Sequence, residues 1–172
     1  MTEDIDRTAT LIAELAARGL TVAVAESLTG GLLVAELIRP AGASAVVVGG
    51  VVAYATELKR TVLGVDGELL DASGPVDPEV ARQMASGVRA ALAFDGRPAD
   101  IGVATTGVAG PDPQGGKAPG TVFLGISTAD GNRAVELALT GDRTAIRAES
   151  VLAAIDMIAA TIQDMGATPA RD

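Results

Sequence analysis

The sequence contains no histidine, no cysteine and no tryptophan, and its only aromatic residues are Tyr54, Phe94 and Phe123. Without histidine, neither a Ser-His-Asp triad nor a histidine general base is available. Without cysteine there is no thiolate nucleophile, no disulfide and no cysteine-bound zinc or iron–sulfur cluster. A catalyst in this chain therefore depends on Ser, Thr, Tyr, Lys, Asp and Glu, or on a metal bound by carboxylates.

Positive charge is also scarce. Thirteen Lys and Arg residues stand against 22 Asp and Glu residues, which gives a net charge of −9. Such a chain is a poor match to duplex nucleic acid, whose phosphates must be neutralised, and three aromatic residues make a poor base-stacking platform. We expect no nucleic-acid partner. A small anionic ligand remains compatible, because backbone N–H groups bind phosphate even on an acidic protein.

Long apolar runs are missing as well. The longest, residues 45–54, is interrupted by Gly49 and Gly50 and is far shorter than the roughly 18 apolar residues of a membrane span. Residues 1–6 are acidic and lack the basic start of a signal peptide. We therefore expect a cytoplasmic protein without a membrane partner.

The chain has 172 residues, of which 48% are hydrophobic and 20% charged. This is enough for one domain with a buried core and is unlike a disordered chain. We expect one domain over residues 1–165 and a frayed tail over residues 166–172. The sequence leaves a homo-oligomer open.

Apolar periodicity and end signals predict alternating helices and strands. Helices are expected at residues 4–18, 31–38, 56–62 (capped by Thr56) and 78–94, and from a cap at Asp142 or Thr144 to 165. Strands are expected at residues 21–25, 45–54, 101–105, 121–128 and 134–140, the last two joined by a turn at residues 130–132. This order indicates an α/β protein with a helix-covered mixed sheet. Parallel strands bind ligands beyond their carboxyl ends, where the glycine-rich segments 26–31 and 106–116 fall.

The first of these segments, Glu26 to Gly31, follows a strand and opens a helix. Its glycines let the backbone approach a ligand, and free N–H groups at the helix start would bind an anion or stabilise an oxyanion. The alternative is that Ser27 or Thr29 only caps the helix.

A second candidate pair is Tyr54 and Lys59. A lysine in a cleft of low dielectric can be neutral enough to act as a base and to activate a serine. The alternative interpretation is that Lys59 and Arg60 form a solvated helix face and that Tyr54 is a strand-end residue with a hydrated hydroxyl.

Two further segments and one acidic cluster complete the candidates. The loop at residues 105–117 is either functional or a flexible surface hairpin. Arg143 is either a phosphate clamp or an ordinary surface charge. Five acidic residues lack the spacing of a metal-binding loop, so we expect no metal site and interpret them as a solvated acidic loop and helix start. They are Asp66, Glu68, Asp71, Asp77 and Glu79.

Five motifs in this order resemble the CinA C-terminal domain family over about residues 5–162. They are Ala25-Glu26-Ser27-x-Thr29-Gly30-Gly31, Tyr54-x4-Lys59, Thr106-Gly107-Val108-Ala109-Gly110-Pro111, Lys117-x-Pro119-Gly120-Thr121-Val122 and Gly141-Asp142-Arg143-x3-Arg147. The resemblance implies a three-layer α/β/α sandwich with a mixed, mostly parallel sheet. It also implies hydrolysis of nicotinamide mononucleotide to nicotinate mononucleotide and ammonia in pyridine-nucleotide salvage, without a cofactor.

In the same way, the resemblance implies that Ser27 is the nucleophile, that Lys59 is its base and that Tyr54 is an assisting hydroxyl. The implied substrate contacts are Glu26, Thr29, Gly30, Gly31, Thr105, Thr106, Gly107, Gly110, Pro111 and Arg143. The chain departs from the family at Leu28 and at residues 73–77, which bears on substrate fit. Two other functions stay open, a non-catalytic nucleotide-binding module and an amidase for a different amide. A metal-dependent hydrolase built on the acidic cluster is a third.

Overall fold

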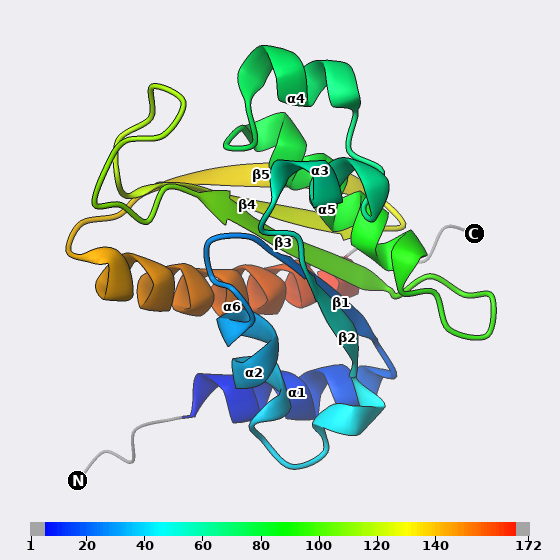
Figure 1. The fold of residues 1–172 in the computed structure, drawn as a ribbon. Helices are drawn as coiled ribbons and strands as arrows, with labels where there is room; N and C mark the ends of the chain where they lie inside the picture. Colours follow the sequence, from blue (N-terminus) through cyan, green and yellow to red (C-terminus); the bar gives the residue numbers. More distant parts are fainter. Residues whose placement is uncertain (1–5, 168–172) are drawn as a thin grey trace, which may run out of the picture.

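The computed structural model describes residues 6–167, which form one sheet covered by helices (Figure 1). The strands are β1 Val22–Glu26, β2 Val47–Val52, β3 Ile101–Gly107, β4 Thr121–Thr128 and β5 Gly131–Ala138. The helices are α1 Arg7–Arg18, α2 Leu32–Ile38, α3 Thr56–Thr61, α4 Gly67–Ser73, α5 Pro78–Ala91 and α6 Arg143–Ala167, with a short 3₁₀ turn, η1, at Ala43–Ala45.

The five strands lie in the order β2-β1-β3-β4-β5. β1 pairs in parallel with both β2 and β3, whereas β4 is antiparallel to β3 and β5. At the end of β1, Glu26 lies opposite Val52 on one side and Thr105 on the other. The three parallel strands therefore end at one edge of the sheet, and the segments that follow them meet there.

Two helical layers enclose the sheet, so the α/β/α sandwich with a mixed sheet is confirmed. α1, α2 and α6 cover one face, where Leu15, Leu33 and Ile158 are fully buried (Figure 1). α3, α4 and α5 lie on the other face, around Met84 and Val88. Because β1 is buried on both faces, its sequence is almost continuously apolar rather than alternating.

The third and fourth strands approach α5 closely through two glycines. A Cβ on Gly102 would lie 2.0 Å from the Ala85 carbonyl oxygen, and one on Gly125 would lie 2.0 Å from the Ala81 carbonyl oxygen. Only glycine permits this contact between backbones. The contact fixes the helix that precedes β3 directly on the sheet.

The largest departure from the predicted elements is α4, which lies in the segment expected to be a solvated acidic loop. Asp66 begins this helix, because its carboxylate accepts the Glu68 N–H at 2.8 Å. Asp77 begins α5 in the same way and accepts the Glu79 N–H at 2.7 Å. Asp66 and Asp77 are therefore start signals for two helices, of which only the second was predicted from the sequence.

Other boundaries differ by a few residues. β2 is shorter than the apolar run 45–54, because this run opens within the 3₁₀ turn and ends in an extended segment. Thr56 is the first residue of α3 and Ala55 occupies the cap position, so Thr56 is not the cap. α5 ends at Ala91 rather than at residue 94. The hairpin turn falls at residues 129–130, one position earlier than predicted.

The structure defines both ends of the last helix, α6, for which the sequence left two possible caps. Asp142 is its cap, since its carboxylate accepts the Ala145 N–H at 2.9 Å. The helix includes residues 166 and 167, so the tail predicted at 166–172 begins too early, and residues 168–172 lie outside the described part, as do residues 1–5. Neither α6 nor any other helix between residues 6 and 167 is long and apolar enough to cross a membrane.

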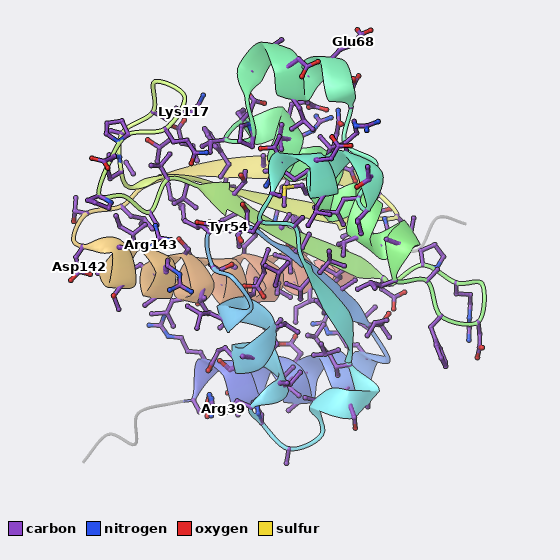
Figure 2. All side chains as sticks on the ribbon, viewed as in Figure 1. Arg39, Tyr54, Glu68, Lys117, Asp142 and Arg143 are labelled. Atoms are coloured by element: carbon purple, nitrogen blue, oxygen red, sulfur yellow. The ribbon has the colours of Figure 1, made fainter. Side chains whose placement is uncertain are left out.

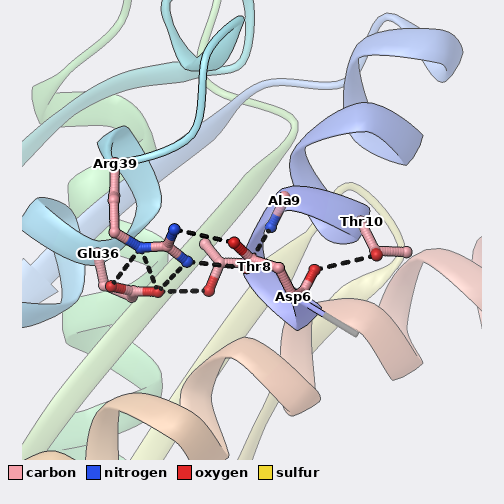
Figure 3. A network of polar contacts seen from close by, with 6 residues as sticks. All are labelled: Asp6, Thr8, Ala9, Thr10, Glu36 and Arg39. Atoms are coloured by element: carbon pink, nitrogen blue, oxygen red, sulfur yellow. Dashed lines mark hydrogen bonds and ion pairs between the residues drawn. The ribbon is translucent and has the colours of Figure 1, made fainter. Parts of the chain in front are cut away.

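A polar network joins the start of α1 to the end of α2 (Figure 3). Arg39 donates to both carboxylate oxygens of Asp6, at 2.9 and 2.8 Å, and also to Glu36. Thr8 donates to Glu36 at 2.6 Å. Hydrogen bonds from Arg39 lower the pKa of Asp6 to about 2. The network holds α2, which follows the turn containing Ser27, against α1.

Candidate active site

A cavity of about 150 Å³ lies at the edge where the parallel strands end. It is formed by the turn after β1, the segment between β2 and α3, the linker between α4 and α5, the loop 108–120 and the start of α6. Figure 2 shows Tyr54 and Arg143 below the loop that carries Lys117. The lining residues are Ser27, Leu28, Tyr54, Thr56, Lys59, Pro75, Val76, Thr106, Gly107, Val108, Ala109, Gly110, Asp112, Gln114 and Arg143.

Ser27 is held at the end of β1 by the neighbouring strand. Its N–H donates to the Thr105 carbonyl oxygen at 3.0 Å, which extends the pairing of β1 with β3 by one residue. Only 8% of Ser27 is exposed. Behind it, the hydroxyls of Thr29 and Thr105 are 2.8 Å apart and fully buried. The turn is thus anchored to β3 and holds Ser27 at the cavity wall.

Lys59 reaches Ser27 from α3. Its Nζ donates to Ser27 Oγ at 3.1 Å and to the Ala53 carbonyl oxygen at 2.7 Å. Only 1% of the residue is exposed, and burial lowers the pKa of the ammonium group to about 8. Arg60, the next residue, is exposed and pairs with Glu57. The interpretation of Lys59 as part of a solvated face is therefore wrong.

A neutral Lys59 fits the same two partners. An uncharged amine keeps two N–H donors and gains a lone pair, so it can donate to Ala53 and accept the hydroxyl proton of Ser27. With the pKa near 8, the neutral form is a sizeable minority at pH 7. The pair can therefore generate a serine alkoxide in the way that a Ser-Lys dyad requires.

Glu26 is occupied by the start of α2. Its buried carboxylate accepts the N–H groups of Gly31 and Leu33, each at 3.0 Å, and of Val34 at 2.9 Å. The expectation that this helix start offers free N–H groups to an anion is wrong, because a carboxylate of the chain already takes them. A substrate contact by Glu26 remains a prediction, and Glu26 does not line the cavity.

The residues around Glu26 support the turn without lining the cavity. Gly30 and Gly31 have φ values of +60° and +98°, and the Gly30 N–H donates to the Ser27 carbonyl oxygen at 3.2 Å. Thr29, Thr105 and Pro111 are also absent from the lining. The substrate contacts expected from these residues therefore stay predictions, whereas their support of Ser27 is visible.

Arg143 and Tyr54 meet at the mouth of the cavity. Arg143 Nη1 donates to the Gly110 carbonyl oxygen at 2.8 Å, and its Nη2 donates to the Tyr54 hydroxyl at 3.4 Å. Tyr54 is 63% exposed, and its hydroxyl makes no hydrogen bond to Ser27 or Lys59. The structure thus joins Tyr54 to Arg143, and an assisting role in proton transfer remains a prediction.

The end of β3 and the loop after it contribute most of the opposite wall, through residues 106–110. The Thr106 hydroxyl donates to the Pro75 carbonyl oxygen at 2.6 Å, which brings Pro75 and Val76 to the cavity. These two residues could not be predicted from the sequence, because nothing in their local pattern shows that a linker between helices would reach β3.

Arg147 was quoted only as part of a motif, without a role. Its Nε donates to the Leu28 carbonyl oxygen at 2.9 Å and its Nη2 to the Thr29 carbonyl oxygen at 3.0 Å. The spacing of four residues from Arg143 was the signal that could have found it, because residues four apart lie on one face of a helix. Both arginines point from α6 toward the site.

Three of the five acidic residues considered for a metal site have structural roles. Asp66 and Asp77 cap helices, and Glu79 pairs with Arg82 at 3.0 Å. Within residues 6–167, no group of three or more acidic side chains is placed to hold a metal ion.

Comparison with known proteins gives a consistent result. The family model described as the CinA C-terminal domain matches residues 5–162. A "CinA-like protein" from Frankia casuarinae is 48% identical over 144 residues, which are 84% of this chain and 32% of that protein. The chain thus spans about a third of the length of such relatives.

Two solved structures share the fold. The competence/damage inducible protein CihA from Agrobacterium tumefaciens is 35% identical, with a TM-score of 0.82 over 93% of this chain and 98% of that one. The competence damage-inducible protein A from Klebsiella pneumoniae is 34% identical, with a TM-score of 0.82 over 91% of this chain and 97% of that one.

Proposed function

Because this chain belongs to the CinA C-terminal domain family, we propose that it hydrolyses the carboxamide of nicotinamide mononucleotide to nicotinate mononucleotide and ammonia. The observation that carries the proposal is the 3.1 Å contact between Lys59 Nζ and Ser27 Oγ inside a cavity. A hydroxyl nucleophile beside a buried amine is a known arrangement for acyl transfer. The reaction belongs to pyridine-nucleotide salvage, and we place it in the cytoplasm.

The first half of the reaction forms an acyl-enzyme. Neutral Lys59 takes the proton of the Ser27 hydroxyl while Oγ bonds to the carboxamide carbon, and the carbonyl π electrons move to oxygen. When the carbonyl re-forms, the C–N bond breaks and Lys59 returns the proton to the leaving nitrogen. Ammonia departs, and Ser27 holds the nicotinate group as an ester.

The second half repeats these transfers with water. Lys59 takes a proton from water as the hydroxide adds to the ester carbon, and Ser27 Oγ then leaves and receives that proton. The products are the nicotinate carboxylic acid, which ionises, and the free serine. Because each proton moves between Ser27, Lys59, water and substrate, the proposal includes neither a metal nor a cofactor.

Arg143 is the group that we assign to the substrate phosphate. It stands at the cavity mouth, and it is held there by the Gly110 carbonyl oxygen and the Tyr54 hydroxyl. A guanidinium group binds a phosphate with two parallel hydrogen bonds. The carboxamide would then lie deep in the cavity beside Ser27, and residues 106–110 would pack along the nucleotide.

The proposal is tested by ammonia release from nicotinamide mononucleotide, with nicotinamide riboside and NAD as comparison amides. We expect turnover of the mononucleotide, loss of at least about 10³-fold in Ser27→Ala, and unchanged circular dichroism. Full activity in Ser27→Ala would contradict the mechanism. Tight binding of the mononucleotide without any ammonia release would instead identify a non-catalytic binding module, and release only from another amide would identify a different amidase.

A further inference from the structure

Two backbone N–H groups of the turn after Ser27 have no partner. Among residues 6–167, the N–H groups of Leu28 and Thr29 donate to no backbone or side-chain acceptor, whereas those of Ser27, Gly30, Gly31 and Leu32 all do. Of the two residues, only Leu28 lines the cavity, and only 4% of it is exposed. Buried N–H groups without an acceptor are rare in folded proteins, and each suggests an acceptor that the chain itself does not supply.

The covalent structure keeps this N–H close to the nucleophile. Only four bonds separate Ser27 Oγ from the Leu28 nitrogen, so the two atoms cannot lie more than about 5 Å apart in any rotamer. An oxyanion formed when Oγ attacks a carbonyl is attached to the same carbon as Oγ. It therefore develops within reach of the Leu28 N–H.

Three hydrogen bonds fix the peptide planes of this turn. The Gly30 N–H holds the Ser27 carbonyl at 3.2 Å, and because the peptide is planar and trans, the Leu28 N–H must point the opposite way. Arg147 holds the next two carbonyls, those of Leu28 and Thr29, at 2.9 and 3.0 Å. The turn is therefore preorganised before any substrate arrives.

We propose that the Leu28 N–H is the oxyanion donor of this site and that Arg147 is the positioning residue that holds the donor in place. The inference rests on the proposed acyl transfer. As the Ser27 Oγ–carbon bond forms and the carbonyl π bond breaks, the oxygen that becomes negatively charged accepts a hydrogen bond from this N–H. A donor that is already oriented stabilises that charge without reorganisation in the transition state.

Rival donors lie on the opposite wall. The N–H groups of Ala109 and Gly110 also have no partner among the described residues, and both residues line the cavity. Neither residue is joined to Ser27 by a short covalent path, so no covalent constraint keeps these N–H groups near Oγ. The Ala109 ester is therefore the comparison that distinguishes this wall from the Leu28 N–H as the donor.

The direct test replaces single N–H groups by oxygen. Leu28 or Ala109 is exchanged for its α-hydroxy acid during synthesis, which converts one amide to an ester and leaves the side chain unchanged. We expect the Leu28 ester to lose about 10²- to 10³-fold in kcat with KM within threefold, and to lose more kcat than the Ala109 ester. The control is the same exchange at Gly96, an exposed residue outside the cavity whose N–H has no partner among the described residues, and its ester should keep kcat and KM within threefold. A kcat loss confined to the Ala109 ester, or no loss in either, would overturn the inference.

A second readout separates this inference from the substrate assignment. A fluorophosphonate reacts with an activated serine through a charged phosphoryl oxygen and needs no nucleotide. Slower labelling of Ser27 in the Leu28 ester than in the unmodified protein supports the inference even if nicotinamide mononucleotide is not hydrolysed. Equal labelling and equal turnover would refute it while leaving the proposed function intact. Absence of both labelling and turnover in the unmodified protein would end both proposals.

Arg147→Ala tests the positioning role. We expect kcat to fall about tenfold or more, with the KM and the midpoint of the pH profile unchanged, and added guanidinium ion to restore part of the rate. Arg133→Ala, on β5, is the control that should neither lose activity nor respond to guanidinium. Failure of guanidinium to rescue, together with a shifted pH midpoint, would show that Arg147 acts on Lys59 or on folding instead.

Discussion

Lys59 Nζ lies 3.1 Å from Ser27 Oγ, although 32 residues separate them in the chain. The amine is buried, so its charged form is poorly solvated. Its other hydrogen-bond partner is the Ala53 carbonyl oxygen. This contact joins a hydroxyl to a buried amine in a protein that contains no histidine. The proposed activity therefore depends on one amine and on its protonation.

The first prediction concerns that amine. Lys59→Met removes the base and keeps the length and most of the volume of the side chain, so ammonia release should fall at least about 10³-fold while the protein stays folded. Arg60→Met, at the exposed neighbouring position, should keep its activity. The assay is ammonia release with thermal unfolding measured in parallel. Residual activity above a tenth of wild type would rule out Lys59 as the base.

The second prediction is the pH dependence of kcat/KM. Only the neutral amine accepts the Ser27 proton, and burial lowers the pKa of Lys59 to about 8. The rate should therefore rise about tenfold per pH unit below pH 8 and level off above it. Measurement between pH 6.5 and 9.5 avoids most of the titration of the substrate phosphate, whose second pKa is about 6. A profile that is flat between pH 7 and 9 would contradict a lysine base.

The third prediction separates binding from chemistry at Arg143. Arg143→Ala should raise the KM for nicotinamide mononucleotide about tenfold or more and change kcat by less than threefold, because the group is assigned to the phosphate. Turnover of nicotinamide riboside, which lacks that phosphate, should not change. An equal loss with both substrates would show that Arg143 shapes the cavity rather than binding phosphate.

The fourth prediction concerns Tyr54, whose hydroxyl accepts a hydrogen bond from Arg143 at 3.4 Å. We expect Tyr54→Phe to raise KM by a few-fold, because Arg143 loses one of its two anchors, and to leave kcat nearly unchanged. The measurement is kcat and KM of Tyr54→Phe and of the wild type with nicotinamide mononucleotide. A large fall in kcat at constant KM would instead support the assisting role in proton transfer that the family resemblance implies.

The fifth prediction concerns stability at the network of Figure 3. The folded-state pKa of Asp6 is about 2, below its ordinary value of 3.8, so the stabilisation is present above about pH 4 and is lost as the pH falls through 2. Arg39→Met should lower the melting temperature at pH 6, and its deficit relative to wild type should shrink toward pH 2. Arg7→Met, which removes one exposed pair with Asp156, should have little effect. If the difference in melting temperature between Arg39→Met and the wild type does not change with pH, the stabilisation does not depend on the ionisation of Asp6.

Local sequence signals predicted most of the fold. Gly19 ends α1 in a left-handed conformation, and Asp77 with Pro78 starts α5, because such end signals act within one turn of helix. The segment that became α4 was missed for a related reason. Its only start signal, Asp66, stood among other acidic residues, and seven residues are too few for a clear apolar period.

The sequence by itself determined the order of elements, the edge of the sheet at which the candidate site lies and the side-chain chemistry that remains without histidine or cysteine. The tertiary structure decided which residues act together. It buried Lys59 against Ser27, engaged Glu26 with the start of α2, and brought Arg147 to the turn after β1. The reason is that a periodic pattern reports on neighbours a few residues apart, whereas burial, the pKa of an amine and the choice of hydrogen-bond partner depend on segments that meet only when the sheet forms.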